Sequence, residues 1–222
     1  MLQTERVPTG ILGLDSLIEG GFPQGRSILI TGEPGTGKSI FALQFLAEGL
    51  KRNEKCIFVS ADENPMDILE QAASMGWDFE PHIENKDLAI LNAGTYLSSF
   101  PGATSERHID VQRAVSDLGN FVKQLGAKRL VLDPAGPFVL LRASTVRIQD
   151  QIRLLIKLMR SSLPTTNVLT SYAVPRTGER SMERGQRKKR VSQECSIECV
   201  AKENSARFGA GAESTSAARE SL

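Results

Sequence analysis

A glycine-rich segment near the start of the chain has the residue types and spacing of a phosphate-binding loop. It matches the pattern G-x-x-x-x-G-K-[ST] at every fixed position. In such a loop the glycines let backbone amides turn towards phosphate oxygens, and the following helix adds its positive dipole end. We therefore predict a site for a nucleoside triphosphate, ATP with magnesium, formed by Gly32, Glu33, Pro34, Gly35, Thr36, Gly37, Lys38 and Ser39.

Two side chains of this loop have specific expected roles. Lys38 is expected to contact the β- and γ-phosphates, and the Ser39 hydroxyl to ligate Mg²⁺. A chance glycine-rich turn is the alternative. The apolar run SILIT before the loop and the helical period of IFALQFLAEGL after it argue against that alternative.

Hydrolysis also needs acidic groups near the metal and the attacking water. Asp133 directly follows the apolar run 130–132, and Asp62 and Glu63 directly follow the run 56–60. Open α/β sheets assemble their sites at such strand ends, so Asp133 is a candidate for the magnesium shell, through a water molecule. The alternatives are a turn aspartate before Pro134 and, for Glu63, a first-turn helix carboxylate.

Short apolar runs alternate with longer segments of helical period between residue 26 and about residue 172. This alternation predicts one α/β layered domain with a mostly parallel sheet flanked by helices. Asn64 before Pro65 predicts a helix start with a capping side chain. The expected strands are Ser27–Thr31, Cys56–Ser60, Leu88–Leu91, Leu130–Leu132 and Asn167–Ser171; the expected helices are Lys38–Lys51, Pro65–Met75, Ile109–Leu125 and Thr145–Ser162.

Composition indicates a globular protein, with 40% hydrophobic and 24% charged residues and a net charge of +1 among 222 residues. Neither a signal peptide nor a run of ~20 apolar residues is found, so we expect a cytoplasmic protein that does not enter membranes. Cys56 is most simply a core residue. Cys195 and Cys199 are spaced for one helix face, but with two distant histidines we set a zinc site aside.

The last part of the chain has a different composition. Residues 176–222 contain ten Lys or Arg and only six large apolar residues. Because such a segment buries little, we expect most of it to be disordered. The basic block 187–190 is its sharpest feature, and a solvated tail is favoured over a nucleic-acid or phosphorylated partner.

The segment before the loop carries a family resemblance. Residues 9–25 read TGILGLDSLIEGGFPQG, which is similar to the TGIxGLDxLLxGGxPxG lead-in of the KaiC-like branch of the RecA superfamily of ATPases. The joint pattern of lead-in and loop is specific, and the similarity covers about residues 5–175. The resemblance implies a RecA-like P-loop NTPase core and self-association in a hexamer-like ring.

The resemblance also implies roles for the acidic residues. In the family a pair of acidic residues follows the second strand, in a context like V-S-x-E-E-x-P; here residues 59–65 read VSADENP. Glu63 then corresponds to the catalytic glutamate that activates water, with Asp62, one methylene shorter than the family's residue, and Lys38 supporting catalysis. Thr170 or Ser171, in the strand that resembles the family's sensor strand, would contact the water or γ-phosphate.

The resemblance stops around residues 181–183, before the further strands that the family has. We therefore expect a domain at 1–175 with an incomplete C-terminal part, and a tail at 176–222 with no strand pattern. We hypothesise that the tail reflects a shifted reading frame or a truncated gene, which the other frames of the nucleotide sequence would test. In the family's oligomers, basic residues reach the nucleotide of a neighbouring subunit; Arg176 and Arg180 are the candidates for this role here.

Three functions are compatible with the sequence. The leading interpretation is a magnesium-dependent ATPase that works as a homo-oligomer in signalling or regulation. One alternative is an autokinase, for which the tail offers the acceptors Ser214, Thr215 and Ser216. The other is a DNA-binding recombinase paralogue that uses the block 187–190, although the tail has Phe208 as its only aromatic residue for base stacking.

Overall fold

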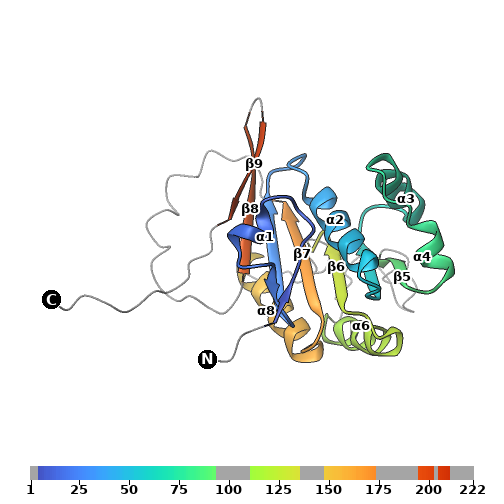
Figure 1. The fold of residues 1–222 in the computed structure, drawn as a ribbon. Coiled ribbons are helices and arrows are strands. Elements are labelled where there is room, and N and C mark those ends of the chain that lie inside the picture. The colour runs from blue at the N-terminus through green and yellow to red at the C-terminus, as the bar shows by residue number, and fades with distance from the viewer. Residues whose placement is uncertain (1–4, 94–110, 136–147, 174–194, 203–204, 211–222) are drawn as a thin grey trace.

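A seven-stranded sheet forms the centre of the structure, a computed structural model that describes residues 5–93, 111–135, 148–173, 195–202 and 205–210. The strand order is β5-β4-β6-β7-β3-β8-β9. All neighbours pair in parallel except β8 and β9, which are antiparallel (Figure 1). The strands are β3 (Ser27–Gly32), β4 (Cys56–Ser60), β5 (Leu88–Asn92), β6 (Arg129–Asp133), β7 (Asn167–Ala173), β8 (Cys195–Lys202) and β9 (Ser205–Ala210).

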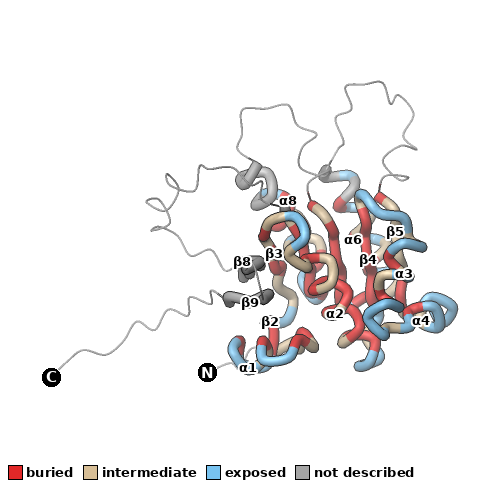
Figure 2. Tube along the Cα trace, turned by 90° about the horizontal axis from the view of Figure 1, so that it is seen from above, coloured by how far each residue is buried: buried red, intermediate tan, exposed pale blue. Residues whose placement is uncertain are grey.

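Helices cover both faces of the sheet. The helix α2 (Lys38–Lys51) contacts β3, β4, β6 and β7, while α6 (Val111–Leu125) and α8 (Ile148–Ser162) contact each other and belong to a second core. The helices α3 (Pro65–Ser74) and α4 (Glu80–Glu84) contact the edge strand β5. Viewed from above, the buried strands run between these layers (Figure 2).

The alternation of side chains along β4 explains the two cores. Cys56 and Phe58 join the cluster on the α2 face, and Ile57 and Val59 join the cluster on the α6 and α8 face. All five residues of β4 are buried. A strand that is buried on both faces reads as a continuous apolar run, which is why the sequence revealed β4 so clearly.

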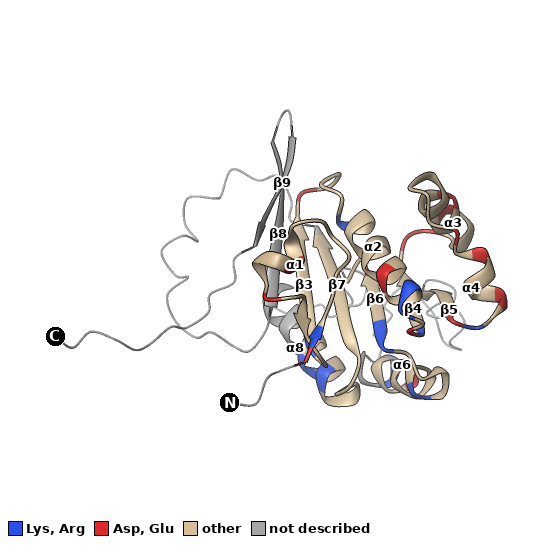
Figure 3. Ribbon diagram, viewed as in Figure 1, with Lys and Arg blue, Asp and Glu red and all other residues tan. Residues whose placement is uncertain are grey.

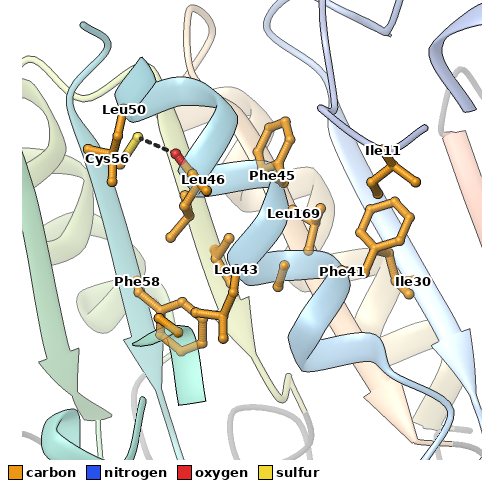
Figure 4. Packing of buried hydrophobic residues seen from close by; sticks show 14 of the residues in the cluster. Ile11, Ile30, Phe41, Leu43, Phe45, Leu46, Leu50, Cys56, Phe58 and Leu169 are labelled. Carbon is orange, nitrogen blue, oxygen red and sulfur yellow. Dashed lines mark hydrogen bonds between the residues drawn. The ribbon is translucent and has the colours of Figure 1, made fainter. Parts of the chain in front are cut away.

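The apolar face of α2 lies directly on the sheet. Phe41, Leu43, Phe45 and Leu46 are at most 2% exposed, and Figure 4 shows them beside residues of the neighbouring strands. This packing fixes the start of α2, and with it the loop after β3, against the carboxyl end of the sheet.

The N-terminal segment forms a small unit of its own. The strand β1 (Arg6–Val7) pairs antiparallel with β2 (Phe22–Pro23), and the short helix α1 (Leu14–Leu17) lies between them in sequence. Ile11, Leu14, Ile18 and Phe22 from this unit enter the core on the α2 face. The lead-in is therefore part of the domain.

The predicted α/β class, the mostly parallel sheet and its flanking helices are confirmed. The helix at 38–51 and the strand at 56–60 have the predicted bounds, and the other central elements differ by a few residues at their ends. Asn64 occupies the N-cap position of α3, but its side chain makes no capping hydrogen bond, so that part of the prediction was wrong. The short elements β1, β2, α1 and α4 were not predicted, because two to five residues carry too little periodicity.

The expectation that no strand follows residue 183 was wrong. The strand β8 pairs with β3 along Ile28–Gly32, and β9 pairs with β8. Cys195 and Cys199 accordingly lie in a strand and not in a helix. The alternation of apolar and polar residues over 195–199 was a strand signal that the prediction missed, because the basic, low-complexity composition of the surrounding segment favoured disorder. The division into a domain at 1–175 and a tail stays a prediction.

Helix length and composition bear on membrane insertion. Within the described ranges, no helix is both long enough and apolar enough to cross a bilayer.

Candidate functional site

The loop between β3 and α2 has the backbone shape that the glycine pattern predicted. Gly35 and Gly37 have positive φ angles of +79° and +83°, and Gly37 is the N-cap of α2. A Cβ placed on either glycine would meet no atom within 4 Å. The space over the loop is therefore open, and backbone conformation rather than crowding requires glycine here.

The helix begins immediately after the loop. The Phe41 N–H donates to the Gly37 carbonyl oxygen over 2.9 Å, and the Thr36 hydroxyl and N–H both bond the Glu33 carbonyl oxygen, over 2.8 and 3.3 Å. The first N–H groups of an α-helix are not needed for its internal hydrogen bonds and can point towards a ligand. An open space, amides at a helix start and the dipole of a 14-residue helix together fit a phosphate group.

Lys38 lies folded against the same loop. Its Nζ donates to the carbonyl oxygens of Gly32, over 3.2 Å, and Glu33, over 2.8 Å, and the residue is only 9% exposed. The ammonium group is thus held at the loop by main-chain oxygens, and the helix start fixes its backbone. Ser39, the next residue, is partly exposed at the first turn of α2.

Asp133 ends β6 and is buried, with 8% of its surface exposed. The Ser171 hydroxyl on β7 donates to the Oδ1 atom of Asp133. The Asp133 carbonyl oxygen accepts from the Ala61 N–H over 3.2 Å. Ser171, which was expected to contact water or phosphate, therefore holds Asp133 in place. Thr170, the other candidate, is buried within β7.

Glu63 and Asp62 follow β4, and both residues are exposed. Partial burial of the Glu63 carboxyl group raises its pKa, and the negative charges of Asp133, Asp67 and Asp62 raise the pKa further. The acidic residues after β4 and β6 therefore act on the same carboxyl group. A carboxyl group with a raised pKa is better suited to accept a proton near neutral pH.

Two residues that the sequence did not single out hold the backbone of Glu63. The Ser60 hydroxyl accepts from the Glu63 N–H over 2.9 Å and donates to its carbonyl oxygen over 2.7 Å. The Asn92 Nδ2 lies 3.5 Å from the same carbonyl oxygen. Ser60 was visible within the segment VSADENP, but nothing in the sequence indicated Asn92.

The sheet topology brings these groups to one edge. Ser60 is in register with Asn92 of β5 and with Asp133 of β6, and Gly32 is in register with Ala173 of β7. The carboxyl ends of β3, β4, β6 and β7 therefore face the same side, where open α/β sheets bind ligands. The phosphate loop with Lys38 and the two acidic strand ends lie along this one edge, where β7 and β6 separate β3 from β4.

Other expected groups lie elsewhere. Arg176, Arg180 and the basic block 187–190 lie outside the described residues, as do the tail hydroxyl residues 214–216. Among the described His, Cys, Asp and Glu residues, no group of three or more is placed to hold a metal ion. Burial raises the pKa of the Cys56 thiol to about 12, as expected for a core cysteine.

Comparison with known proteins identifies relatives across most of the chain. The family model described as "ATPase: KaiC" matches residues 7–208. A UPF0273 protein of Methanopyrus kandleri is 31% identical over 174 residues, which are 77% of this chain and 68% of that protein. A UPF0273 protein of Aeropyrum pernix is 33% identical, over 75% of this chain and 68% of that protein.

The circadian clock oscillator protein KaiC of Parasynechococcus marenigrum is 35% identical over 80% of this chain, but the match spans only 34% of that longer protein. Among solved structures, a KaiC-like protein of Pyrococcus horikoshii superposes with a TM-score of 0.67 at 27% identity. That match covers 92% of this chain and 86% of the other. With this sequence match and this fold, the chain belongs to the KaiC family of ATPases, ATP-binding proteins with a RecA-like core.

Proposed function

We propose that this chain hydrolyses ATP to ADP and phosphate in a magnesium-dependent reaction at the carboxyl edge of its sheet. The observation that supports this proposal is the position of the loop, Lys38, Asp133 and Glu63 at the same edge of the sheet, with the pKa of Glu63 raised by burial and by its acidic neighbours. A binding site alone would not require a carboxyl group with a raised pKa at this edge.

The residues divide the work as follows. The backbone N–H groups of the loop, which all its residues except Pro34 have, hold the phosphates together with Lys38. The Lys38 charge offsets the negative charge that develops on the γ-phosphoryl group. Glu63 orients the attacking water and accepts its proton, while Asp62 adds negative charge beside it. The water oxygen attacks the γ-phosphorus, and the bond between the γ-phosphorus and the bridging oxygen that leaves with ADP breaks.

The donor set fits a magnesium ion. The Ser39 hydroxyl would ligate it directly and the Asp133 carboxylate through water, and oxygen atoms are the ligands that this ion prefers. Bound there, the ion would neutralise phosphate charge. Ser171 contributes by fixing the orientation of the Asp133 carboxylate.

The proposal is tested with three proteins and two assays. Binding of a fluorescent ATP analogue and release of phosphate are measured for the wild type, Lys38→Ala and Glu63→Gln. We expect Lys38→Ala to lose affinity, since its ammonium group is removed from the loop. Glu63→Gln should keep wild-type affinity while its turnover falls by about 100-fold or more, because the carboxylate that receives the proton is lost.

Two results would change the assignment. Equal turnover in the wild type and Glu63→Gln would leave a nucleotide-binding protein without the proposed catalytic glutamate. Transfer of label from [γ-³²P]ATP to the chain itself, instead of release as phosphate, would indicate the autokinase reaction.

We also propose that the chain self-associates and serves a regulatory role, as its resemblance to clock proteins suggests. Sedimentation velocity with and without Mg-ATP tests the first part. We expect a larger species with nucleotide for the wild type and a smaller one for Lys38→Ala. A monomer under all conditions would remove self-association from the proposal.

A further inference from the structure

The turn that carries Glu63 is closed by one side chain. The Ser60 hydroxyl bonds both the N–H and the carbonyl oxygen of Glu63, over 2.9 and 2.7 Å, and so joins the end of β4 to a residue three positions later. Ser60 is 1% exposed, whereas Glu63 is exposed. The backbone of Glu63 is therefore held by a buried side chain, although Glu63 itself is an exposed residue.

The strands on both sides of β4 reinforce this turn. On the β6 side, the Ala61 N–H donates to the Asp133 carbonyl oxygen over 3.2 Å. On the β5 side, Asn92 reaches the Glu63 carbonyl oxygen at 3.5 Å. Because Ser60 is in register with both Asn92 and Asp133, the turn has a fixed position relative to the magnesium-shell candidate.

At the start of α3, the carbonyl oxygen of Asn64 accepts from the Ile68 N–H over 3.3 Å, which restrains the residue after Glu63. The Asn64 side chain makes no capping bond. The most direct restraint on the position of Glu63 is therefore the pair of bonds from Ser60. A displacement of about 1 Å at a reacting group can cost up to ~100-fold in rate, so this restraint bears on turnover.

We propose that Ser60 is a positioning residue for ATP hydrolysis, which holds Glu63 at the right place relative to the γ-phosphate and Asp133. This inference rests on the proposed function, in which Glu63 serves the attacking water. Ser60 has no role in holding ATP itself.

The test compares Ser60→Ala with Ser60→Thr. We expect Ser60→Ala to lower kcat roughly 10-fold or more, with KM for ATP and the affinity for the fluorescent analogue within about twofold of the wild type. Ser60→Thr keeps the hydroxyl and should recover most of the rate. A matched control is Ser74→Ala, which removes an exposed hydroxyl that bonds a nearby carbonyl oxygen in α3, over 2.7 Å, and should leave kcat unchanged.

A double-mutant cycle separates positioning from general damage to the fold. If Ser60 acts through Glu63, adding Ser60→Ala to Glu63→Gln should lower kcat no further. An additional 10-fold loss in that background, or failure of Ser60→Thr to recover the rate, would overturn the inference. If Ser60→Ala does not fold, Asn92→Ala weakens the same restraint and should lower kcat with KM unchanged.

The two proposals fail in different ways. Loss of turnover in Glu63→Gln with wild-type kcat in Ser60→Ala would overturn the positioning role and leave the proposed function intact. Equal turnover in Glu63→Gln and the wild type would overturn both.

Discussion

At the scale of single residues, Glu63 is the group whose environment bears most on the chemistry. It follows β4 in the same cluster as Asp133, Asp67 and Asp62, and their charges add to the effect of partial burial. Each of these causes disfavours the carboxylate form, so the pKa rises. In the proposed reaction Glu63 accepts a proton and must therefore be deprotonated, so we expect turnover to fall as the pH drops below this raised pKa.

Removing one neighbouring negative charge should change the pH at which turnover begins to fall. Asp67→Asn leaves Glu63 with less repulsion, so its pKa falls and the acidic limb of the kcat profile moves to lower pH. Glu70→Gln removes an exposed charge on the same helix that does not act on Glu63, and should leave the limb in place. A limb that moved equally in both variants would point to net charge instead.

At the scale of elements, the lead-in and α2 form one unit that supports the loop. The Asp15 carboxylate accepts from the Thr9 N–H and hydroxyl, over 2.8 and 2.7 Å, and Gln44 of α2 donates to the Gly10 carbonyl oxygen over 2.6 Å. Gly10 has a φ of +73°, and a Cβ there would lie 2.6 Å from the Cβ of Glu48 on α2. The lead-in motif is thus explained by close contact with the helix that begins at the loop.

Two glycine substitutions separate the stability cost of backbone strain from the cost of losing the contact between the lead-in and α2. Gly13 has a φ of +82°, but a Cβ there would meet nothing within 4 Å, so Gly13→Ala should cost only the left-handed conformation, about 1–2 kcal/mol. Gly10→Ala carries that strain and also pushes the lead-in away from α2, so we expect a loss of about 3 kcal/mol or more. Urea unfolding of both variants measures the difference. Equal losses would show that the contact with α2 is unimportant for stability.

At the scale of the whole molecule, Arg129 joins elements that are far apart in sequence. It is 0% exposed at the start of β6. Its Nε donates to Glu54 over 2.5 Å, and its Nη1 donates to the carbonyl oxygens of Pro8 and Phe45, over 2.8 and 2.7 Å. A Cβ on Gly49 would lie 2.6 Å from the Arg129 side chain, which explains a glycine inside α2 despite its cost to helix stability.

Replacing this arginine should destabilise the entire domain. Arg129→Lys keeps the charge but loses the planar group that serves three acceptors, so we expect a loss of about 3 kcal/mol or more in the free energy of unfolding. Arg52→Lys is the matched control, since its ion pair with Glu48 is solvent-exposed and should contribute under ~1 kcal/mol. Urea denaturation followed by circular dichroism checks both. Similar losses would indicate that the buried contacts of Arg129 contribute little.

The charge distribution belongs to the same scale. Acidic residues are frequent along α3 and α4, next to the edge strand β5, while most of the basic residues that Figure 3 colours belong to other elements. Asp67 in α3 is one of the charges that raise the pKa of Glu63. At least one negative charge from this side of the molecule, that of Asp67, therefore acts on the candidate site.

Local sequence determined the elements that depend on local interactions. The loop at 32–39 follows from glycines that permit positive φ, the helix at 38–51 from its apolar period, and the strand at 56–60 from continuous apolar character. The sequence also indicated Glu63 and Asp133, because residues directly after parallel strands gather at one edge. These inferences need no knowledge of which strands are neighbours.

Only the tertiary structure decided which side chains meet. Ser171 bonds Asp133 across 38 positions, and Arg129 bonds the carbonyl oxygen of Pro8 across 121 positions, contacts set by strand order and register. The strand β8 pairs with β3, although only residues 195–199 of its sequence alternate between apolar and polar side chains. Even the turn at 60–63 escaped local rules, since a Ser hydroxyl has several nearby partners. In the structure the neighbouring strands restrain this turn: the Ala61 N–H donates to the carbonyl oxygen of Asp133 in β6, and Asn92 of β5 lies at the Glu63 carbonyl oxygen.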